Sequence, residues 1–356
     1  MKARLLPHTI YIARKLNLQL ALAIVLASLL FVAPPVISDA QAKTFKIATL
    51  SPDGSFWMQQ MRKGAKDIEK QTSGRVKFKF YPGGVMGNNK AVLRKMRIGQ
   101  LQGGALTGGS LSKFNKDNQI YMMTMKYRNQ GEIEHVRHHV DPILIEGMEK
   151  GGLINFGIAE GGFVYIMSTK NPVASVEQLQ QQKAWIPAND QAALEMIQEF
   201  GVSPIPLPLG DVLAGLQTGL IDTVAMSPIG AIALQWHTQI KYLTHLPMLY
   251  SYGVLVLDKK AFKKIKADDQ KIVRKIMTDI FKVLDKKNKK DNVEALAALK
   301  SLGIKFVEPD NSQVTGWRAA GEKAQHKVIN SGLITKSLNS KIDKYLEDYR
   351  SHTSKK

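Results

Sequence analysis

The chain has 356 residues, 44% of them hydrophobic, and its 50 Lys and Arg against 30 Asp and Glu give a formal net charge of +20. This is ordinary globular composition, and the length suggests about two domains. The absence of cysteine excludes disulfides, iron–sulfur clusters, cysteine-ligated zinc and a thiol nucleophile, whereas the positive charge fits an anionic partner, a membrane surface or a well-solvated exterior equally well.

The first 42 residues have the pattern of a secretory signal peptide. A basic start precedes an almost uninterrupted apolar run at 18–33, and Ala-Gln-Ala at 40–42 provides the small residues that a signal peptidase requires. An anchoring transmembrane helix is the alternative, but it needs about 20 apolar residues, and this run is shorter and ends in Pro34-Pro35. We therefore predict a mature chain that begins at Lys43 and acts outside the cytoplasm, where nucleic acid is not an expected partner.

The chain after the signal peptide opens with alternating strand and helix patterns. The expected strands are at residues 44–50, 76–80 and 103–109, and the expected helices follow the loop 51–55 to about residue 71 and cover 90–98. This β-α-β-α-β order predicts an α/β fold in which helices pack on the faces of a sheet.

A second run of the same kind begins near residue 153. Its expected strands are at 153–159, 163–168, 183–187 and 220–227, and its expected helices are at 190–200 and 212–218. Gly161-Gly162 is expected to separate the first two of these strands. A further strand at 251–257 is expected to return to the sheet of the first unit.

Residues 267–302 have a continuous helical pattern. Ile272, Ile276 and Ile280 lie on one stripe, and Gly303 is a stop signal. Roughly 35 residues at about 1.5 Å each span on the order of 50 Å, more than one unit of this size. We therefore expect the helix to run across both units. Its lysines suggest either a binding stripe for anionic partners or, as an exported protein favours, a solvated face.

No catalytic motif stands out in the sequence. There is no Gly-x-Ser-x-Gly elbow, and the glycines at 83–87 and 103–109 lack the Gly-Lys-Ser/Thr of a phosphate loop. His135, His138 and His139 have a helical spacing that can place two ligands on one face, but without a His-Glu-x-x-His order we predict no metal and no cofactor. A two-lobe α/β scaffold with a solute-binding cleft that closes by a hinge motion remains.

Several segments resemble the solute-binding proteins of tripartite ATP-independent periplasmic (TRAP) transporters, in that family's order and spacing, over nearly all of residues 43–340. The segments are Tyr-Pro-Gly-Gly-Val-Met-Gly at 81–87 followed by 92–101, the stretch 171–179 leading to Lys-Ala-Trp-Ile-Pro at 183–187, and 201–209 running into 216–222. The resemblance implies a clamshell of two α/β lobes with crossing hinge strands and a long bridging helix. It also implies that the protein catalyses nothing and delivers a small organic solute to the membrane subunits of a TRAP permease.

The boundaries that we expect are residues 43–161 with 246–285 for lobe I, and residues 162–245 with 286–356 for lobe II. We expect a monomer. Two other interpretations stay open, namely a periplasmic enzyme whose site lies at the His135 cluster or Asp222, and a sensor or carrier that hands its solute to a different partner.

Trp185 stands where this sequence departs from the family. Many members have an Arg at the third position of a Lys-x-Arg-Val-Pro segment, which binds the substrate carboxylate through two hydrogen bonds. A second frequent Arg falls on Tyr165, and a frequent Asn falls near Ser227. The resemblance therefore implies a cleft without the usual guanidinium groups, which favours an apolar or aromatic solute over a small dicarboxylate. Burial of Trp185 in the core is the alternative.

The resemblance also implies further ligand contacts in both lobes. They fall on Leu50, Ser51, Asn88, Asn89 and Thr107 in lobe I and on Leu209 in lobe II. Trp57, at the start of the first helix, is expected to close over the ligand, although a buried helix Trp is an equally good interpretation. Trp236 is expected to line the mouth of the cleft.

Overall fold

The computed structural model describes residues 42–353, so the expected signal peptide lies outside the described part apart from its last residue. Strands β1 (Lys43–Thr49), β2 (Val76–Tyr81) and β3 (Gly103–Thr107) pair in parallel, and α2 (Phe56–Gln71) and α3 (Asn89–Arg97) connect them. This is the β-α-β-α-β order that the sequence predicts. The side chain of Ser55 caps α2 and that of Asn88 caps α3.

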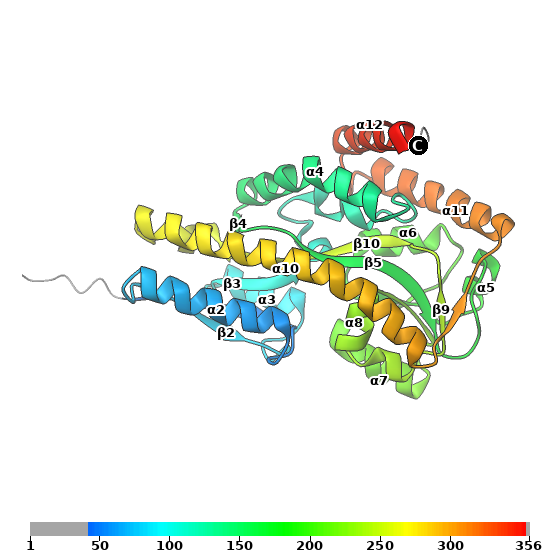
Figure 1. Ribbon diagram of the computed structural model, residues 1–356, viewed down its shortest axis with the longest axis horizontal. Coiled ribbons are helices and arrows are strands. Elements are labelled where there is room, and N and C mark those ends of the chain that lie inside the picture. The colour runs from blue at the N-terminus through cyan, green and yellow to red at the C-terminus, as the bar shows by residue number, and fades with distance from the viewer. Residues whose placement is uncertain (1–41, 354–356) are drawn as a thin grey trace, which may run out of the picture. The chain divides into compact units, whose positions relative to one another are not determined.

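Two long antiparallel strands, β5 (Ala159–Ser168) and β10 (Leu249–Asp258), join the two parts of the sheet (Figure 1). β10 pairs with β3 and with β4 (Leu153–Asn155), so the expected return to the first sheet is confirmed. β5 pairs with β10 through its first half. Its second half pairs with β8 (Thr223–Met226) and β9 (Tyr242–Thr244).

The expected break at Gly161-Gly162 is wrong, because β5 continues through both glycines. Gly162 has a φ of 90°, and the pairing register shifts opposite it, between Ser251 and Tyr252 of β10. Only glycine adopts this backbone conformation without strain. The glycine pair therefore kinks a continuous crossing strand instead of ending it.

Helix α10 (Ala267–Ser301) confirms the expected bridging helix (Figure 1). It packs against α2 of the first lobe, against the crossing strand β5 and against α8 (Pro228–Ala233) of the second lobe. Near the kink in β5, Asn292 of α10 donates a hydrogen bond from Nδ2 to the carbonyl of Gly161 at 3.3 Å. One helix thus supports both lobes and the strand that connects them.

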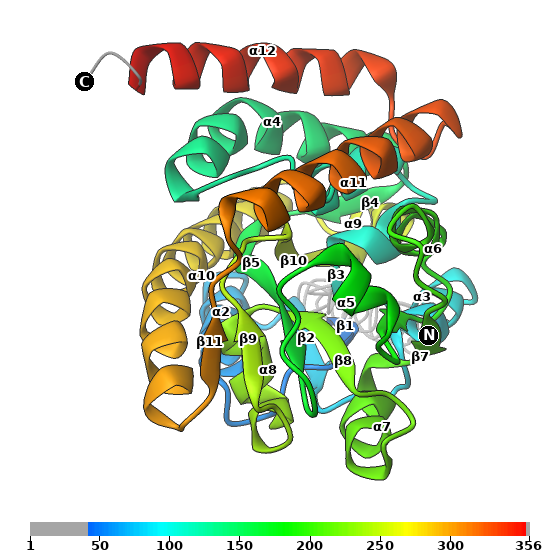
Figure 2. The same cartoon turned by 90° about the vertical axis from the view of Figure 1, so that its right-hand side faces the viewer.

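The remaining elements complete the second lobe and cover the sheet. They are α4 (Gln130–Lys150), α5 (Val176–Gln180), β6 (Trp185–Pro187), α6 (Gln191–Gln198), β7 (Ile205–Leu207), α7 (Val212–Thr218), α9 (Lys259–Phe262), β11 (Lys305–Val307), α11 (Asn311–Asn330) and α12 (Lys336–Thr353). Single 3-10 turns are η1 (Gly108–Leu111), η2 (Lys116–Met122), η3 (Leu209–Asp211) and η4 (Trp236–Thr238). Helix α11 packs on α6, and α12 packs on α4 (Figure 2). Within residues 42–353, no helix is both long and apolar enough to cross a bilayer.

Candidate functional site

A cleft of about 1440 Å³ is lined by residues from both lobes. Its first wall consists of the loop after β1, the starts of α2 and α3, the end of β3 and turns η1 and η2. Its second wall consists of β6, the start of α6, turn η3, the end of β8 and the start of α8. Loops at the carboxyl ends of strands form much of both walls, which is the usual place for a ligand in α/β proteins.

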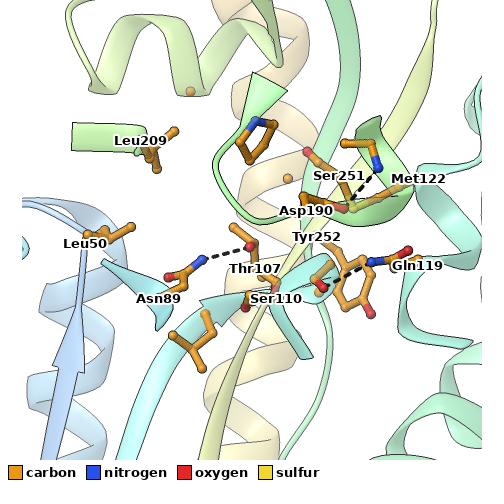
Figure 3. A pocket seen from close by; sticks show the side chains of 18 of the residues that line it. Leu50, Asn89, Thr107, Ser110, Gln119, Met122, Asp190, Leu209, Ser251 and Tyr252 are labelled. Atoms are coloured by element: carbon orange, nitrogen blue, oxygen red, sulfur yellow. Dashed lines mark hydrogen bonds between the residues drawn. The ribbon is translucent and has the colours of Figure 1, made fainter. Parts of the chain in front are cut away.

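Nine of the eleven residues that the sequence predicts for the site line this cleft. They are Leu50, Ser51, Trp57, Asn88, Asn89 and Thr107 on the first wall and Trp185, Leu209 and Ser227 on the second. Figure 3 shows Leu50, Asn89 and Thr107 on one side and Leu209 on the other. Contact between these residues and a ligand stays a prediction.

The first wall contains buried polar atoms without a partner. Asn89 donates from Nδ2 to Thr107 Oγ1 at 3.1 Å, but its Oδ1 has no hydrogen-bond partner (Figure 3). The indole Nε1 of Trp57 is likewise buried and unpaired, while its ring packs edge-on against Phe281. An unpaired buried polar group costs about 1–3 kcal/mol.

Trp185 is held in the core of the second lobe. Its Nε1 donates to the carbonyl of Leu207 at 2.9 Å, its ring packs edge-on against Trp236 with centroids 5.3 Å apart, and only 6% of its surface is exposed. The structure therefore favours the core-packing interpretation, and only a small part of the ring borders the cleft. Trp236 lies beneath this ring, 1% exposed, and does not line the cleft as expected.

The structure places Tyr165 outside the cleft lining, against expectation. Side chains of a strand alternate between its two faces, and on β5 the neighbours Val164 and Ile166 line the cleft. Tyr165 lies instead near His245, with ring centroids 6.2 Å apart, and burial raises the pKa of its phenol. A guanidinium at this position would point away from the solute.

The residues suggested for a catalytic or metal site have structural contacts. Asp222 is 7% exposed, and its Oδ1 accepts from the backbone N–H of Lys183 at 2.8 Å. His135 and His139 lie on α4, where the ring of His139 stacks on Tyr345 with centroids 4.4 Å apart. In the part of the chain that the structure describes, no group of three or more potential ligands is placed to hold a metal.

Asp190, at the start of α6, is a charged cleft residue that sequence reasoning missed. Its Oδ1 accepts from the N–H of Ala193 at 3.0 Å, and its Oδ2 lies against Gly109 of the first wall. Burial raises the pKa of this carboxyl, although backbone N–H groups of α6 oppose the shift. Next to it, Asn189 accepts a hydrogen bond from Lys90 Nζ at 3.2 Å, so the two walls touch here. The sequence shows that Asp190 can cap a helix, but no sequence pattern shows that its side chain faces a cleft.

The basic residues of the cleft lie at its rim. Among the described residues, the Lys and Arg that line it are Lys90, Arg94, Arg97, Lys113 and Lys260, and each of them is exposed. The interior of the cleft therefore contains no buried guanidinium or ammonium group among residues 42–353.

Comparison with known proteins gives the family. The sequence matches the profile of the bacterial extracellular solute-binding proteins, family 7, over residues 47–331. A solute-binding protein of Albidiferax ferrireducens is 23% identical over 316 residues, which cover 83% of this chain and 89% of that protein. The sialic acid-binding periplasmic protein SiaP of Vibrio cholerae is 20% identical over 274 residues, 76% of this chain and 84% of that protein.

Solved structures show the same fold. The sugar acid binding protein of Advenella mimigardefordensis in complex with galactonate superposes with a TM-score of 0.79 at 17% identity, over 87% of this chain and 100% of that one. The family and these relatives are substrate-binding proteins and not enzymes. Since the family profile covers most of the sequence, the chain belongs to bacterial extracellular solute-binding protein family 7, the solute-binding proteins of TRAP transporters that the sequence motifs resemble.

Proposed function

We propose that this protein captures a small organic solute in the periplasm and delivers it to the membrane subunits of a TRAP transporter. Solute-binding proteins of this family work with such subunits, which supports the delivery step. The signal-peptide pattern of the first 42 residues supports export, with a mature monomer that begins at Lys43. Sequencing the N-terminus of the exported protein tests this processing, and a retained Met1 would contradict it.

The solute of this protein is more apolar or aromatic than a small dicarboxylate and carries no carboxylate group. The observation that carries this proposal is the exposure of every Lys and Arg that lines the described cleft. A buried carboxylate without a cationic partner loses the hydrogen bonds of the usual clamp, at roughly 1.5–3 kcal/mol each. Two such bonds correspond to a factor of about 10²–10⁴ in affinity. The matched proteins include binders of galactonate and sialic acid, both acids, and under this proposal the chain differs from them in ligand class.

The unpaired atoms of the first wall support the same conclusion. Trp57 Nε1 is a donor and Asn89 Oδ1 an acceptor, and neither has a partner. A hydroxyl group can accept from an indole N–H and can donate to an amide oxygen, so hydroxyl groups of a solute suit both atoms. An apolar or aromatic solute that carries a hydroxyl therefore fits this wall better than a carboxylate, which cannot donate when ionised.

The two lobes are expected to close over the solute by bending of the crossing strands that connect them. We place the hinge at the kink of β5, consistent with residues 43–161 and 246–285 in lobe I and residues 162–245 and 286–356 in lobe II. The contact between Lys90 and Asn189 shows that the walls meet at one point. Small-angle scattering with and without a stabilising solute should show compaction on binding. Unchanged dimensions despite tight binding, with a closed unliganded form excluded, would contradict a clamshell mechanism.

Matched solutes that differ only in charge test the ligand class. We expect tyrosol and D-glucose to raise the melting temperature more than their acids, 4-hydroxyphenylacetate and D-glucuronate, because the acids lose hydration without a buried cation to bind. Replacing Trp57 with Phe keeps an aromatic ring, although a smaller one, and removes the unpaired donor; it should weaken binding of the best alcohol by about 3–10-fold. If the acids or succinate give the largest stabilisation, the proposed ligand class is wrong.

A further inference from the structure

Asp190 is a carboxyl group in the cleft wall without a cationic partner. Its hydrogen bonds come from backbone N–H groups of α6. Among residues 42–353, no Lys, Arg or His forms an ion pair with it. Two other buried carboxylates are paired with a guanidinium, Glu132 with Arg350 and Asp269 with Arg75. Glu160 and Asp222 instead accept hydrogen bonds from the side chain of Gln130 and the backbone N–H of Lys183. Removing a carboxylate from water without a counter-charge is unfavourable, so Asp190 requires an explanation.

Capping of α6 accounts for only one of the two carboxyl oxygens of Asp190. A cap needs one acceptor oxygen, which Asn or Ser supplies as well as Asp. In Asp190 that oxygen is Oδ1, which accepts from Ala193 at 3.0 Å. Oδ2 faces the first wall, where a methyl group added to Gly109 would lie only 3.1 Å from it. The capping role therefore accounts neither for the charge nor for the direction of Oδ2.

Figure 3 draws Gln119, Met122 and Tyr252 at the same end of the cleft as the carboxyl of Asp190. Gln119 is 4% exposed, its Nε2 donates to the carbonyl of Gly109 at 3.3 Å, and its Oε1 has no partner. The thioether of Met122 lies against the same glycine. The ring of Tyr252 packs under Gly108, and its hydroxyl donates away from the cleft to the carbonyl of Asn118. An aromatic face, a thioether and an unpaired carbonyl beside a carboxylate form a suitable environment for a cation.

We propose that Asp190 is a specificity-determining residue that binds a protonated amine of the solute, with Gln119 and the ring of Tyr252 beside it. The proposal rests on the proposed function, since it names the charged group of a solute that has no carboxylate clamp to bind it. Asp190 belongs to the second wall, and Gln119 and Tyr252 belong to the first. An ammonium group bound between them would contact both lobes and favour the closed form.

The test compares Asp190→Asn with the natural protein. Asn keeps the capping oxygen and removes the charge. Asp211→Asn is the matched control, because Asp211 also precedes a helix but is exposed and does not line the cleft. The probes are two matched sets, tyramine with tyrosol and 4-hydroxyphenylacetate, and D-glucosamine with D-glucose and D-glucuronate. Melting temperature and calorimetric affinity are measured for each.

In the natural protein, we expect an amine to bind at least tenfold more tightly than its alcohol and acid. Asp190→Asn should remove this preference while alcohol binding stays within twofold, and Asp211→Asn should change neither. If Asp190→Asn does not fold, Asp190→Ser replaces it, since Ser also caps helices well. Solute released from protein purified without denaturant is identified by mass spectrometry in parallel, and we expect a basic nitrogen in it.

Distinct results separate this inference from the proposed function. Alcohols that bind as well as amines, or an amine preference that survives in Asp190→Asn, would overturn the role of Asp190 and leave intact the proposal that the solute carries no carboxylate. Acids that bind best would overturn both. If no probe binds, the co-purified solute decides, and a solute without a basic nitrogen overturns the inference.

Discussion

Replacing Trp185 with Ala tests whether this residue supports the fold or the ligand. The ring is 6% exposed, packs edge-on against Trp236 and donates to Leu207. A buried aromatic side chain covers about 150–250 Å², and at about 25 cal/mol per Å² this corresponds to about 4–6 kcal/mol. Trp-to-Ala replacements in cores cost about 3–5 kcal/mol. For a chain of this size, that loss lowers the melting temperature by roughly 6–10 °C.

The assay measures melting temperature and solute affinity on the same preparations. Trp185→Phe is the milder control, because it keeps an aromatic ring but loses the hydrogen bond to Leu207, at about 1 kcal/mol, together with part of the indole's packing. Trp236→Ala and the double variant should reveal a coupling of about 0.5–1.5 kcal/mol between the two rings. A Trp185→Ala variant that melts like the natural protein but no longer binds solute would refute core packing and restore the ligand contact expected from the sequence.

Two further predictions concern the hinge and the C-terminal helix. Gly162→Ala should destabilise the folded protein by at least 1 kcal/mol, because the φ of this residue is 90° and the new methyl group would lie 2.4 Å from Asn292 Nδ2. The control is Gly316→Ala in α11, where a new methyl group meets no neighbouring atom, so the melting temperature should stay unchanged or rise. Equal melting temperatures for the two variants would contradict backbone strain at Gly162. Burial acts to raise the pKa of Glu132, but hydrogen bonds from Arg350 at 2.8 and 2.9 Å hold that pKa below its usual value. The resulting stabilisation is fully present above the pKa of the unfolded state, about 4.3, and is lost as the pH falls through the pKa of the folded state. The free energy of unfolding should therefore fall less between about pH 5 and 3 in Glu132→Gln than in the natural protein. Parallel curves of unfolding free energy against pH would contradict this.

Local periodicity was sufficient to predict most of the fold. The helical stripe at 267–302 matches α10 within one residue, because consistent apolar spacing over many turns leaves little ambiguity. Gly161-Gly162 was misinterpreted because a glycine pair suits a turn and a kink equally, and only pairing with β10 distinguishes them. No element was expected after residue 303, although α11 and α12 cover α6 and α4 there.

The cleft residues were predicted correctly where the family's motifs lie in loops, and the prediction failed where the motifs lie in strands. Leu50, Asn89 and Leu209 follow strands or open helices, so their places in the motif are enough to bring them to the cleft. Tyr165 lies within a strand, where a shift of one residue exchanges the faces. Trp185 also lies on a strand. Its ring packs against Trp236, which is about 50 residues further along the chain, so local sequence could not show that this ring is buried.

Net charge and local charge act on different steps of solute capture. The net positive charge of the chain attracts anions toward the surface, but at physiological ionic strength this attraction decays over about 8 Å. Selection among the solutes that arrive depends on groups removed from water, where charges are screened less. In this cleft the exposed rim is basic, whereas the carboxyl of Asp190 lies in the wall with a raised pKa and without a counter-ion. The rim therefore affects how often an anion encounters the cleft, while the wall determines which solute stays bound, and a protein selected for carboxylates would have the opposite arrangement.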